Sequence, residues 1–307
     1  MRRVSVVLPT YNRAHSVGRA ISSVLAQEFG DFELIIVDDG STDETEAVIR
    51  GFVDDRLIYL KQDVNLGVNA ARNRAIAAAT GELVCFLDSD DEFLPHKLRT
   101  VVDYFEAQPE TALLIDSFEL SKAGKPGEPC KVRRNPDLDD SAEIERRIYA
   151  REIYKATPAL NVRRPALMAV GGFDHALERR EDMDLALKLA RCGKCASTAK
   201  VLWRKHWTFG SLSNKSSTFM GAVLGICARH PDYLAKPEFR IGLARDVSRH
   251  VFRLALKGHF AAAGGDVRRF IKAHGGLRTA HLMAVGVVEM SRRNFGAGHA
   301  DAGYGTS

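Results

Sequence analysis

The stretch Leu83-Val84-Cys85-Phe86-Leu87-Asp88-Ser89-Asp90-Asp91 decides the fold class of this chain. Its first five residues are apolar, as in a strand buried within a parallel sheet. Because Asp is a poor strand residue, the strand must end at Asp88, and ligands of open α/β sheets bind along that edge. Neighbouring carboxylates repel unless a cation or donors hold them, and oxygen ligands suit Mg²⁺ or Mn²⁺. In the alternative reading Asp90 or Asp91 caps a helix, but a cap needs one Asp and not three. The stretch therefore predicts a divalent metal site.

The sequence on both sides of this stretch alternates short apolar runs with helical patterns, which predicts βαβ units and a mostly parallel sheet flanked by helices. We expect strands at 4–8, 34–37, 57–60, 83–87 and 113–115, and helices at 15–27, 67–80, 95–108, 166–170 and 182–191. Ser41-Thr42-Asp43-Glu44 has the spacing of a capping box and predicts another helix start. Residues 121–140 read as an exposed loop or hairpin, the chain after 220 as mostly helical, and 296–307 as a frayed end.

The charge is unevenly distributed along the chain. The net charge of +5 arises from 44 Lys and Arg against 39 Asp and Glu. Between residues 240 and 300, eleven Lys and Arg stand against three acidic residues. A basic C-terminal part indicates an anionic partner, such as a membrane surface or a polyanionic glycan.

A candidate membrane helix lies in this basic part. Four cations recur on or near one helix face: Arg245, Arg249, Arg253 and Lys257. Apolar surface beside them is supplied by Val247, Val251, Phe252, Leu254, Ala255 and Phe260. Such a helix can lie in the headgroup plane of an anionic bilayer. The alternative is a solvated face of a helix that packs on the rest of the protein.

Neither end of the sequence suggests a membrane span. The apolar run within the first nine residues is too short for a signal sequence, and no stretch reaches the length of a transmembrane helix. The odd number of cysteines, five, argues against a disulfide framework. We therefore expect a cytoplasmic protein, with a peripheral position at the inner face of the membrane as the further expectation from its basic C-terminal part.

Polar residues follow each expected strand of the first half. They are Pro9-Thr10-Tyr11-Asn12, Asp38-Asp39-Gly40-Ser41, Asn65-Leu66-Gly67 and Asp88-Ser89-Asp90. Four such loops at one edge of a parallel sheet predict a ligand crevice. The first strand is not followed by GxGxxG or by a Walker sequence, so a dinucleotide enzyme or a P-loop NTPase is disfavoured. A nucleotide in this crevice would have to be held by side chains.

The same motifs, in this order and spacing, resemble the family 2 glycosyltransferases. The resemblance covers residues 3 to about 215 and rests on Val6-Val7-Leu8-Pro9-Thr10-Tyr11-Asn12, Ile35-Ile36-Val37-Asp38-Asp39-Gly40-Ser41-Thr42-Asp43, Asn65-Leu66-Gly67 with Ala71-Arg72-Asn73, and Phe86 to Asp91. A second block resembles the acceptor-side motif of the family: Gly171-Gly172-Phe173-Asp174 followed by Glu181-Asp182-Met183-Asp184-Leu185. Many members carry an Arg near the position where this chain has Lys188. The resemblance implies the GT-A fold and inverting transfer from a nucleotide-activated sugar.

The resemblance also implies roles for individual residues. The nucleotide sugar would be bound by Pro9, Thr10, Tyr11, Asp39, Arg72, Asp88 and Ser89. The Tyr11 ring would pack on the base, Asp39 would accept a hydrogen bond from N3–H of uracil or thymine, and Asp88 would reach the ribose. Asp90 of the DXD motif would bind Mn²⁺ or Mg²⁺ between the phosphates, with His206 as a further candidate ligand, while Arg204 and Lys205 are candidate phosphate contacts. Asp182 would be the general base for the acceptor hydroxyl.

The resemblance gives a domain plan and a set of partners. A GT-A domain would span 1–215, with a nucleotide-binding half at about 1–110 and an acceptor-binding half at about 111–215, followed by a helical basic extension at 216–307. The partners would be a UDP- or dTDP-sugar and a glycan or lipid-linked acceptor used in cell-surface polysaccharide synthesis, with no nucleic acid. Two alternatives stay open: a catalytically inactive glycan-binding or scaffold homologue, and a sugar-1-phosphate nucleotidyltransferase. The latter would need a Gly-rich, Arg-containing loop after the first strand, where Pro9-Thr10-Tyr11-Asn12 stands.

Overall fold

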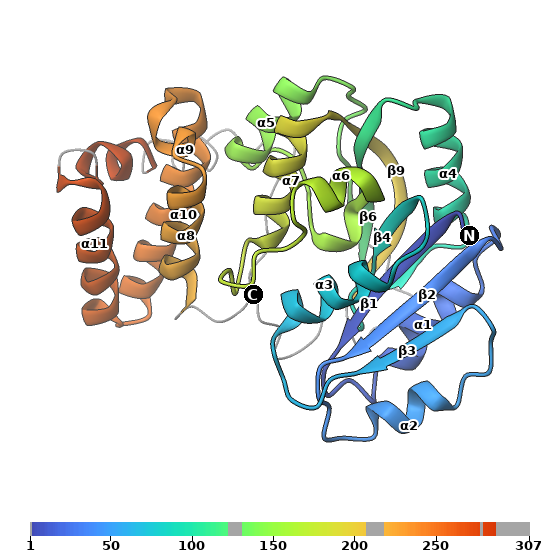
Figure 1. Ribbon diagram of the computed structural model, residues 1–307. Helices are drawn as coiled ribbons and strands as arrows, with labels where there is room; N and C mark the ends of the chain where they lie inside the picture. The colour runs from blue at the N-terminus through green and yellow to red at the C-terminus, as the bar shows by residue number, and fades with distance from the viewer. Residues whose placement is uncertain (1, 122–130, 207–217, 277–278, 287–307) are drawn as a thin grey trace. The chain divides into compact units, whose positions relative to one another are not determined.

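The computed structural model describes residues 2–121, 131–206, 218–276 and 279–286 of the chain (Figure 1). It divides into two compact units: unit 1 contains Met1–Ile148 and Glu152–Lys215, and unit 2 contains Tyr149–Arg151 and Ser216–Ser307.

The strands of unit 1 lie where apolar runs or alternating residues stand in the sequence. They are β1 (Val4–Thr10), β2 (Phe32–Asp38), β3 (Leu57–Lys61), β4 (Leu83–Phe86), β5 (Glu92–Phe93), β6 (Thr111–Ser121), β7 (Lys131–Arg133), β8 (Leu160–Arg163) and β9 (Lys194–His206). The helices are α1 (Val17–Leu25), α2 (Thr45–Arg50), α3 (Val68–Ala78), α4 (Lys97–Ala107), α5 (Ser141–Ala150), α6 (Arg164–Ala169) and α7 (Glu181–Cys192), with a 3-10 turn at Thr157–Ala159. All strands and helices that we expect from the sequence up to residue 191 are present, with shifted ends.

The described strands form one sheet in the order β3-β2-β1-β4-β8-β6-β9-β5, with β7 paired to β6. The first four strands are parallel, so this half of the fold is as predicted. The sheet becomes mixed where β8 enters antiparallel to both β4 and β6. Every residue of β1, β2 and β4 is buried, because helices cover both faces of the parallel half. Figure 1 shows α3 on the near face of these strands and α1 on the far face.

The order of the strands places a crevice at one edge. From β1 the chain moves outward to β2 and β3, and then returns through α3 to β4 on the other side of β1. The two neighbours of β1 therefore diverge at its carboxyl end, which is the topological switch point where α/β sheets bind ligands. Thr10 pairs with Asp38, and the backbone N–H of Leu87 donates to Val7 at 2.9 Å, so Asp88 emerges at the same edge.

The start of α2 differs from the capping box that the sequence predicts. The helix begins at Thr45, and Ser41 does not cap it. Instead Asp43 Oδ1 accepts from the backbone N–H of Thr45 at 3.0 Å, while Ser41 Oγ accepts from the backbone N–H of Asn12 at 2.9 Å. Ser41 thus joins the loops after β1 and β2, which is why the capping-box prediction is wrong.

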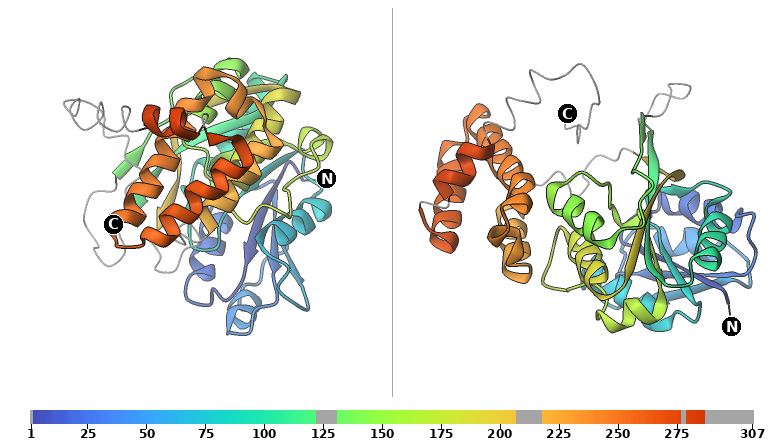
Figure 2. Two further views of the ribbon diagram at one scale, coloured as in Figure 1. Left: turned by 90° about the vertical axis from the view of Figure 1, so that its left-hand side faces the viewer. Right: turned by 90° about the horizontal axis from the view of Figure 1, so that it is seen from above.

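Unit 2 is helical, as predicted for the C-terminal part. Its helices are α8 (Phe219–Arg229), α9 (Asp232–Ala235), α10 (Pro237–Leu256) and α11 (Phe260–His274), and α10 runs beside α11 (Figure 2). Tyr149 stacks on Phe239 with ring centroids 4.2 Å apart, which fastens this short segment to the helices of the unit. No helix among the described residues is both long and apolar enough to cross a bilayer.

The basic face expected on α10 is only partly correct. Arg245 is buried, and its Nη2 donates to the carbonyl of Ala150 at 3.0 Å, so it belongs to the core of unit 2. Val247 and Leu254, expected as exposed apolar surface, are buried as well. The expected frayed end at 296–307 and residues 122–130 of the expected loop lie outside the described residues, whereas β7 pairs antiparallel with β6 as in a hairpin.

Candidate active site

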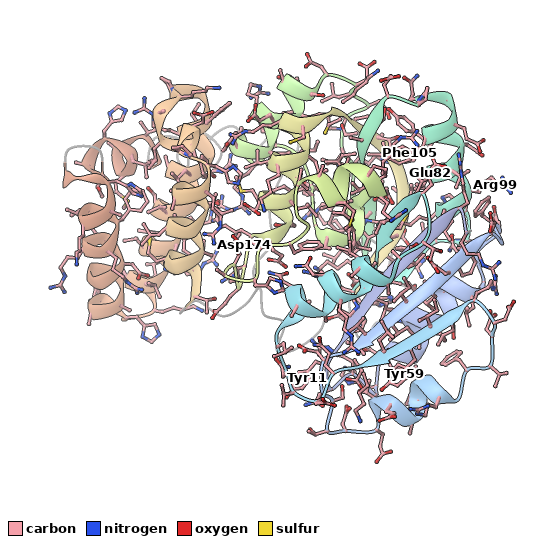
Figure 3. The ribbon with its side chains drawn as sticks, viewed as in Figure 1. Tyr11, Tyr59, Glu82, Arg99, Phe105 and Asp174 are labelled. Carbon is pink, nitrogen blue, oxygen red and sulfur yellow. The ribbon has the colours of Figure 1, made fainter. Side chains whose placement is uncertain are left out.

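The loop after β1 opens the site at the carboxyl edge of the sheet. Pro9 and Thr10 are buried, whereas the side chain of Tyr11 is 43% exposed. In Figure 3 Tyr11 lies at the end of the parallel strands opposite to Glu82, Arg99 and Phe105. Thr10 Oγ1 is buried and has no hydrogen-bond partner among the described residues. An unsatisfied buried hydroxyl beside an exposed aromatic ring is a feature that a bound polar ring would complete.

Asp39 is buried at the end of β2 and organises the neighbouring loop. Its Oδ1 accepts from the side chain of Gln62 and from the backbone N–H of Leu66 at 2.8 Å, and its Oδ2 accepts from the backbone N–H of Gly67 at 2.8 Å. Gly40 has φ of 76°, and a Cβ there would lie 2.8 Å from the backbone of Val64, so only glycine fits. Because a carboxylate oxygen has two lone pairs, Oδ2 retains acceptor capacity beyond its bond with Gly67.

The carboxylates after β4 differ in burial. Asp88 and Asp90 are half-buried, whereas Ser89 and Asp91 are buried. Asp91 Oδ1 accepts from the backbone N–H of His206 at 2.9 Å. Burial raises the pKa of Asp91 well above its ordinary value, and the neighbouring Asp90 and Asp88 raise it further against the opposing charge of Lys205. The carboxylates of Asp88, Asp90 and Asp91 therefore act on one another at this edge, with Lys205 as an opposing charge.

Lys205 is the cation that faces this cluster. It lies near the end of β9 and pairs in register with Leu120 of β6. Burial alone would lower the pKa of Lys205, but the charges of Asp91, Asp88, Asp90 and Asp182 raise it. Three of these carboxylates, Asp88, Asp90 and Asp182, are the ones that the resemblance assigns to the donor and to the base, and they act on one lysine.

The oxygen donors at this edge fit a divalent cation bound together with a diphosphate. The described residues contain no group of three or more His, Cys, Asp or Glu side chains close enough to hold a metal ion by themselves. Mg²⁺ and related cations that bind substrate phosphates use one or two protein carboxylates, with the phosphates and water completing the shell. Asp88 and Asp90 are half-buried and offer such oxygens, so the residues fit this type of site.

His206, the further candidate ligand, is engaged by Glu92. Its Nε2 lies 3.2 Å from Glu92 Oε1. His206 is the first cause that lowers the pKa of Glu92 to about 2; burial opposes it, and Arg204 lowers the pKa further. Arg204 also donates from Nε to Glu119 at 2.6 Å. The guanidinium of Arg204, a candidate phosphate contact, is therefore already paired with Glu92 and Glu119. His206 could bind a metal ion through Nδ1, or through Nε2 if its contact with Glu92 were broken.

Helix α3 forms hydrogen bonds with the segment that leads to α7. Asn69 Nδ2 donates to the carbonyls of Asp174 at 3.0 Å and Leu177 at 2.7 Å. Asn73 pairs with the backbone of Phe173 in both directions, donating at 2.7 Å and accepting at 2.9 Å. Sequence reasoning missed both asparagines, although Asn73 belongs to a quoted motif. These bonds fix the segment that leads to α7.

Arg72 joins the two halves of the site. The residue is 3% exposed; its Nη2 donates to Asp88 Oδ1 at 2.8 Å and its Nη1 to Glu181 Oε1 at 3.0 Å. The guanidinium also lies over the ring of Phe173, with Cζ 5.1 Å from the centroid. Burial would lower the pKa of Arg72, but Asp88 and Glu181 raise it, so this side chain is a fixed charge. Arg72 is thus a buried link between Asp88 and Glu181, and its contact with the nucleotide stays a prediction.

Asp182 lies in the first turn of α7, directly after Glu181. Its side chain is 25% exposed; Oδ1 accepts from the backbone N–H of Met183 at 2.6 Å and lies 3.9 Å from Lys155 Nζ. Arg180, the residue before the helix, has φ of 66°, a left-handed conformation that is uncommon outside glycine and is often found at functional sites. Asp182 is thus an accessible carboxylate with a defined orientation.

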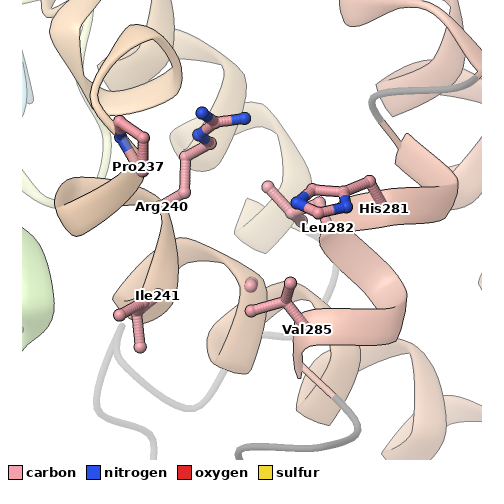
Figure 4. Close-up of a pocket in the computed structure, with 7 residues that line it drawn as sticks. Pro237, Arg240, Ile241, His281, Leu282 and Val285 are labelled. Carbon is pink, nitrogen blue, oxygen red and sulfur yellow. The ribbon is translucent and has the colours of Figure 1, made fainter.

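Two further features do not include residues of this arrangement. Lys188 Nζ lies 2.7 Å from Asp184 Oδ2, so the residue at the position of the family Arg pairs within its own helix. A hollow in unit 2 is lined by Pro237, Arg240, Ile241, Ala244, His281, Leu282 and Val285 (Figure 4). None of these lining residues belongs to the strand ends or to α7.

Comparisons with known proteins agree with this geometry. Residues 5–138 match the model of glycosyl transferase family 2. The succinoglycan biosynthesis protein ExoO of Rhizobium meliloti is 31% identical over 217 residues, which are 68% of this chain and 62% of ExoO. The UDP-Glc:alpha-D-GlcNAc-diphosphoundecaprenol beta-1,3-glucosyltransferase WfgD of Escherichia coli is 40% identical over 136 residues, which are 43% of this chain and 53% of WfgD. The matched part of this chain therefore spans less than two thirds of the length of these relatives.

Solved structures share the fold. S. aureus TarS 1-349 in complex with UDP-GlcNAc superposes with a TM-score of 0.71 at 21% identity, covering 99% of this chain and 95% of that one. The mannosyltransferase PcManGT from Pyrobaculum calidifontis, in complex with GDP-Man and Mn²⁺, superposes with a TM-score of 0.57 at 19% identity, covering 96% and 82%. At these identities the likeness establishes the fold alone. With the family match and the relatives, it shows that this chain belongs to glycosyltransferase family 2 and has the GT-A fold.

Proposed function

We propose that this protein is an inverting, metal-dependent glycosyltransferase. It would move a sugar from a nucleoside diphosphate donor, with UDP- or dTDP-sugars favoured, to a hydroxyl of a glycan or lipid-linked acceptor in cell-surface polysaccharide synthesis. The observation that carries this proposal is the position of Arg72. Its guanidinium contacts Asp88 at the strand edge and Glu181 next to Asp182, so one donor-side carboxylate and the residue adjacent to the candidate base are held on one buried cation.

The donor would bind across the carboxyl ends of β1, β2 and β4. The base would pack on Tyr11 and meet Thr10 and Asp39, with Asp88 and Ser89 at the ribose. The unsatisfied hydroxyl of Thr10 and the remaining lone pair of Asp39 Oδ2 support this assignment. A carboxylate acceptor can bind the N3–H of uracil or thymine, as the proposed UDP- or dTDP-sugar donor requires.

A divalent cation would be held by Asp90, with Asp88 close by. When bound, Mn²⁺ or Mg²⁺ would neutralise the charge that develops on the leaving diphosphate. The proximity of the Asp88, Asp90 and Asp91 carboxylates supports a cation at this place, and His206 stays a candidate ligand. Lys205 would contribute a second, permanent positive charge.

Asp182 would act on the acceptor side. It would take the proton of the acceptor hydroxyl while the hydroxyl oxygen bonds to the anomeric carbon. The bond from that carbon to the diphosphate oxygen breaks, and its electron pair leaves with the diphosphate, so the configuration inverts. Transition states of glycosyl transfer resemble an oxocarbenium ion, which a carboxylate on the face opposite the leaving group stabilises. Arg72 and the asparagines of α3 would keep this carboxylate facing the donor.

The relatives bear on the acceptor. WfgD is named for transfer to a diphosphoundecaprenol-linked sugar, and ExoO for succinoglycan biosynthesis. A lipid-linked acceptor sits in a membrane, so we place this protein at the membrane surface, held through its basic C-terminal part. In this plan residues 1–110 bind the nucleotide, 111–215 bind the acceptor and 216–307 form the extension.

A donor-hydrolysis screen tests this proposal, because slow hydrolysis needs no acceptor. The purified protein is incubated with UDP-, dTDP- and GDP-sugars in Mn²⁺, Mg²⁺ or excess chelator, and release of the nucleotide is measured. We expect a nucleoside diphosphate from a uracil or thymine donor, in the presence of metal only. Formation of a nucleoside triphosphate from pyrophosphate would instead indicate a nucleotidyltransferase, and glycan binding without any turnover an inactive homologue.

A further inference from the structure

Three large apolar side chains are exposed at the corner between α10 and α11. Phe252 is 59% exposed, Leu256 72% and Phe260 70%. Phe252 and Leu256 are four residues apart and share a face of α10, and Phe260 begins α11 after a turn that contains Gly258. We call these three residues the apolar corner.

The exposure of the apolar corner does not mean that unit 2 lacks a hydrophobic core. Unit 2 buries Leu243, Val247 and Leu254 of α10 and Phe270 of α11, so both helices already pack through other faces. Clusters of exposed large apolar side chains usually mark an interaction surface.

The sequence around the apolar corner is rich in cations. Between residues 249 and 276 the chain has six Lys and Arg and one acidic residue, Asp266. That carboxylate is already occupied, because Oδ2 lies 2.8 Å from His250 Nε2 and Oδ1 2.5 Å from Arg269 Nη2. Arg249, Lys257 and Lys272 form no ion pair with any described residue. Arg249 lies three residues before Phe252, and Lys257 directly follows Leu256, so two of these cations adjoin the apolar corner.

From this arrangement we infer that the apolar corner inserts into the headgroup region of an anionic lipid bilayer while Arg249, Lys257 and Lys272 contact lipid phosphates. A bilayer with anionic lipids offers both an apolar interior and negative charge, which this surface needs together. A second copy of the same surface would bring like charges against each other, so self-association is disfavoured. The inference identifies the membrane-binding surface of the proposed function, but the lipid contact itself does not require transferase activity.

Vesicle co-sedimentation of the full-length protein tests this inference. The vesicles contain phosphatidylcholine alone or with phosphatidylglycerol. The variants are F252S/L256S/F260S for the apolar corner and R249Q/K257Q/K272Q for the cations. The matched control is Ile241→Ser, which changes an exposed apolar residue of the same helix that lies outside the corner. Because these side chains are exposed, apart from the half-buried Arg249, circular dichroism should show the wild-type helix content in each variant.

The wild type and Ile241→Ser should bind the anionic vesicles and not the neutral ones, with binding that weakens as salt rises. The cation variant should bind roughly 100-fold more weakly at low salt, since each of the three Lys or Arg near an anionic surface contributes about 1 kcal/mol, or about fivefold. The corner variant should lose at least about tenfold in affinity even though its charge is unchanged. All variants should keep the donor-hydrolysis rate of the wild type.

Two results would overturn the inference. One is wild-type protein that stays in the supernatant with anionic vesicles at low salt. The other is concentration-dependent self-association, or binding of an acidic protein, that the corner variant abolishes while lipid binding is unaffected. Lipid binding with no donor hydrolysis would leave this inference standing and contradict the proposed activity instead, so the two failures are distinguishable.

Discussion

Nη2 of Arg72 lies 2.8 Å from Oδ1 of Asp88, which ties helix α3 to the carboxylate that ends the fourth strand. The same side chain reaches Glu181 at 3.0 Å, at the start of α7. A residue that the family resemblance places at the nucleotide therefore also links the carboxylate after β4 to the start of α7. Removal of Arg72 would leave Asp88 and Glu181 without the buried cation that they share.

Arg72→Gln should lower both stability and activity. The change leaves Asp88 and Glu181 without their shared cation, and loss of one partner of a largely buried pair costs up to about 3 kcal/mol. Thermal unfolding of the variant and its donor hydrolysis would be compared with Arg74→Gln, which alters a surface arginine of the same helix. We expect a lower melting temperature and a loss of hydrolysis for Arg72→Gln only. Equal behaviour of the two variants would show that Arg72 is not the link.

Asp182→Asn should separate binding from transfer. The amide is nearly isosteric with the carboxylate but cannot take up a proton, so transfer should fall by about 10²–10⁴-fold. Donor affinity, measured by calorimetry, should stay within about twofold of the wild type, because Asp182 lies on the acceptor side of the site. A large loss of donor affinity with an unchanged transfer rate would assign Asp182 to the nucleotide pocket.

Lys205→Met should weaken donor binding. Lys205 faces Asp88, Asp90 and Asp91, and the diphosphate that we place beside them adds further negative charge. Charge-assisted hydrogen bonds to phosphate contribute about 1.5–3 kcal/mol, so affinity should fall by roughly tenfold or more. Lys200→Met on the exposed part of the same strand is the control and should be neutral. If both variants bind donor like the wild type, Lys205 balances the carboxylates and does not touch the donor.

The loop before β3 should contribute a pH-dependent part of the stability. Asp54 accepts from Arg56 at its side chain and backbone, and these bonds lower the pKa of Asp54 from 3.8 to about 2. A carboxylate whose pKa is lower in the folded state stabilises the fold above its unfolded pKa of about 4 and loses this effect as pH falls through about 2. Asp54→Asn should therefore lower the melting temperature at pH 6 but not near pH 2. A difference that persists unchanged across that range would contradict this explanation.

The sequence predicts the parallel half of the fold because its strands are continuous apolar runs and its loops carry recognisable turn residues. Strand β9 could not be predicted in the same way. It mixes Lys and Arg with apolar residues, and its pairing with β6 contains register shifts that break a regular alternation. Its position matters for the site, since β9 brings Lys205 and His206 to the Asp cluster.

The residues of the candidate site also divide into those that the sequence predicts and those that it does not. The Asp cluster and Asp182 can be found from motifs, because their residue types already indicate the chemistry. Asn69 and Asn73 could not, because an asparagine within a helix carries no signal until the distant backbone that it binds is known. The bonds of Asp39 to Leu66 and Gly67 likewise depend on the approach of two loops.

The most direct test of the central claim is metal-dependent release of nucleotide from a nucleotide sugar. Wild-type protein, Asp90→Asn and the exposed control Asp55→Asn would be incubated with UDP-glucose in Mn²⁺, in Mg²⁺ and in excess chelator, and UDP would be quantified over time. The account predicts release by the wild type and by Asp55→Asn with metal, and loss of release in Asp90→Asn and in chelator. Undiminished release in excess chelator, or full activity of Asp90→Asn, would contradict it.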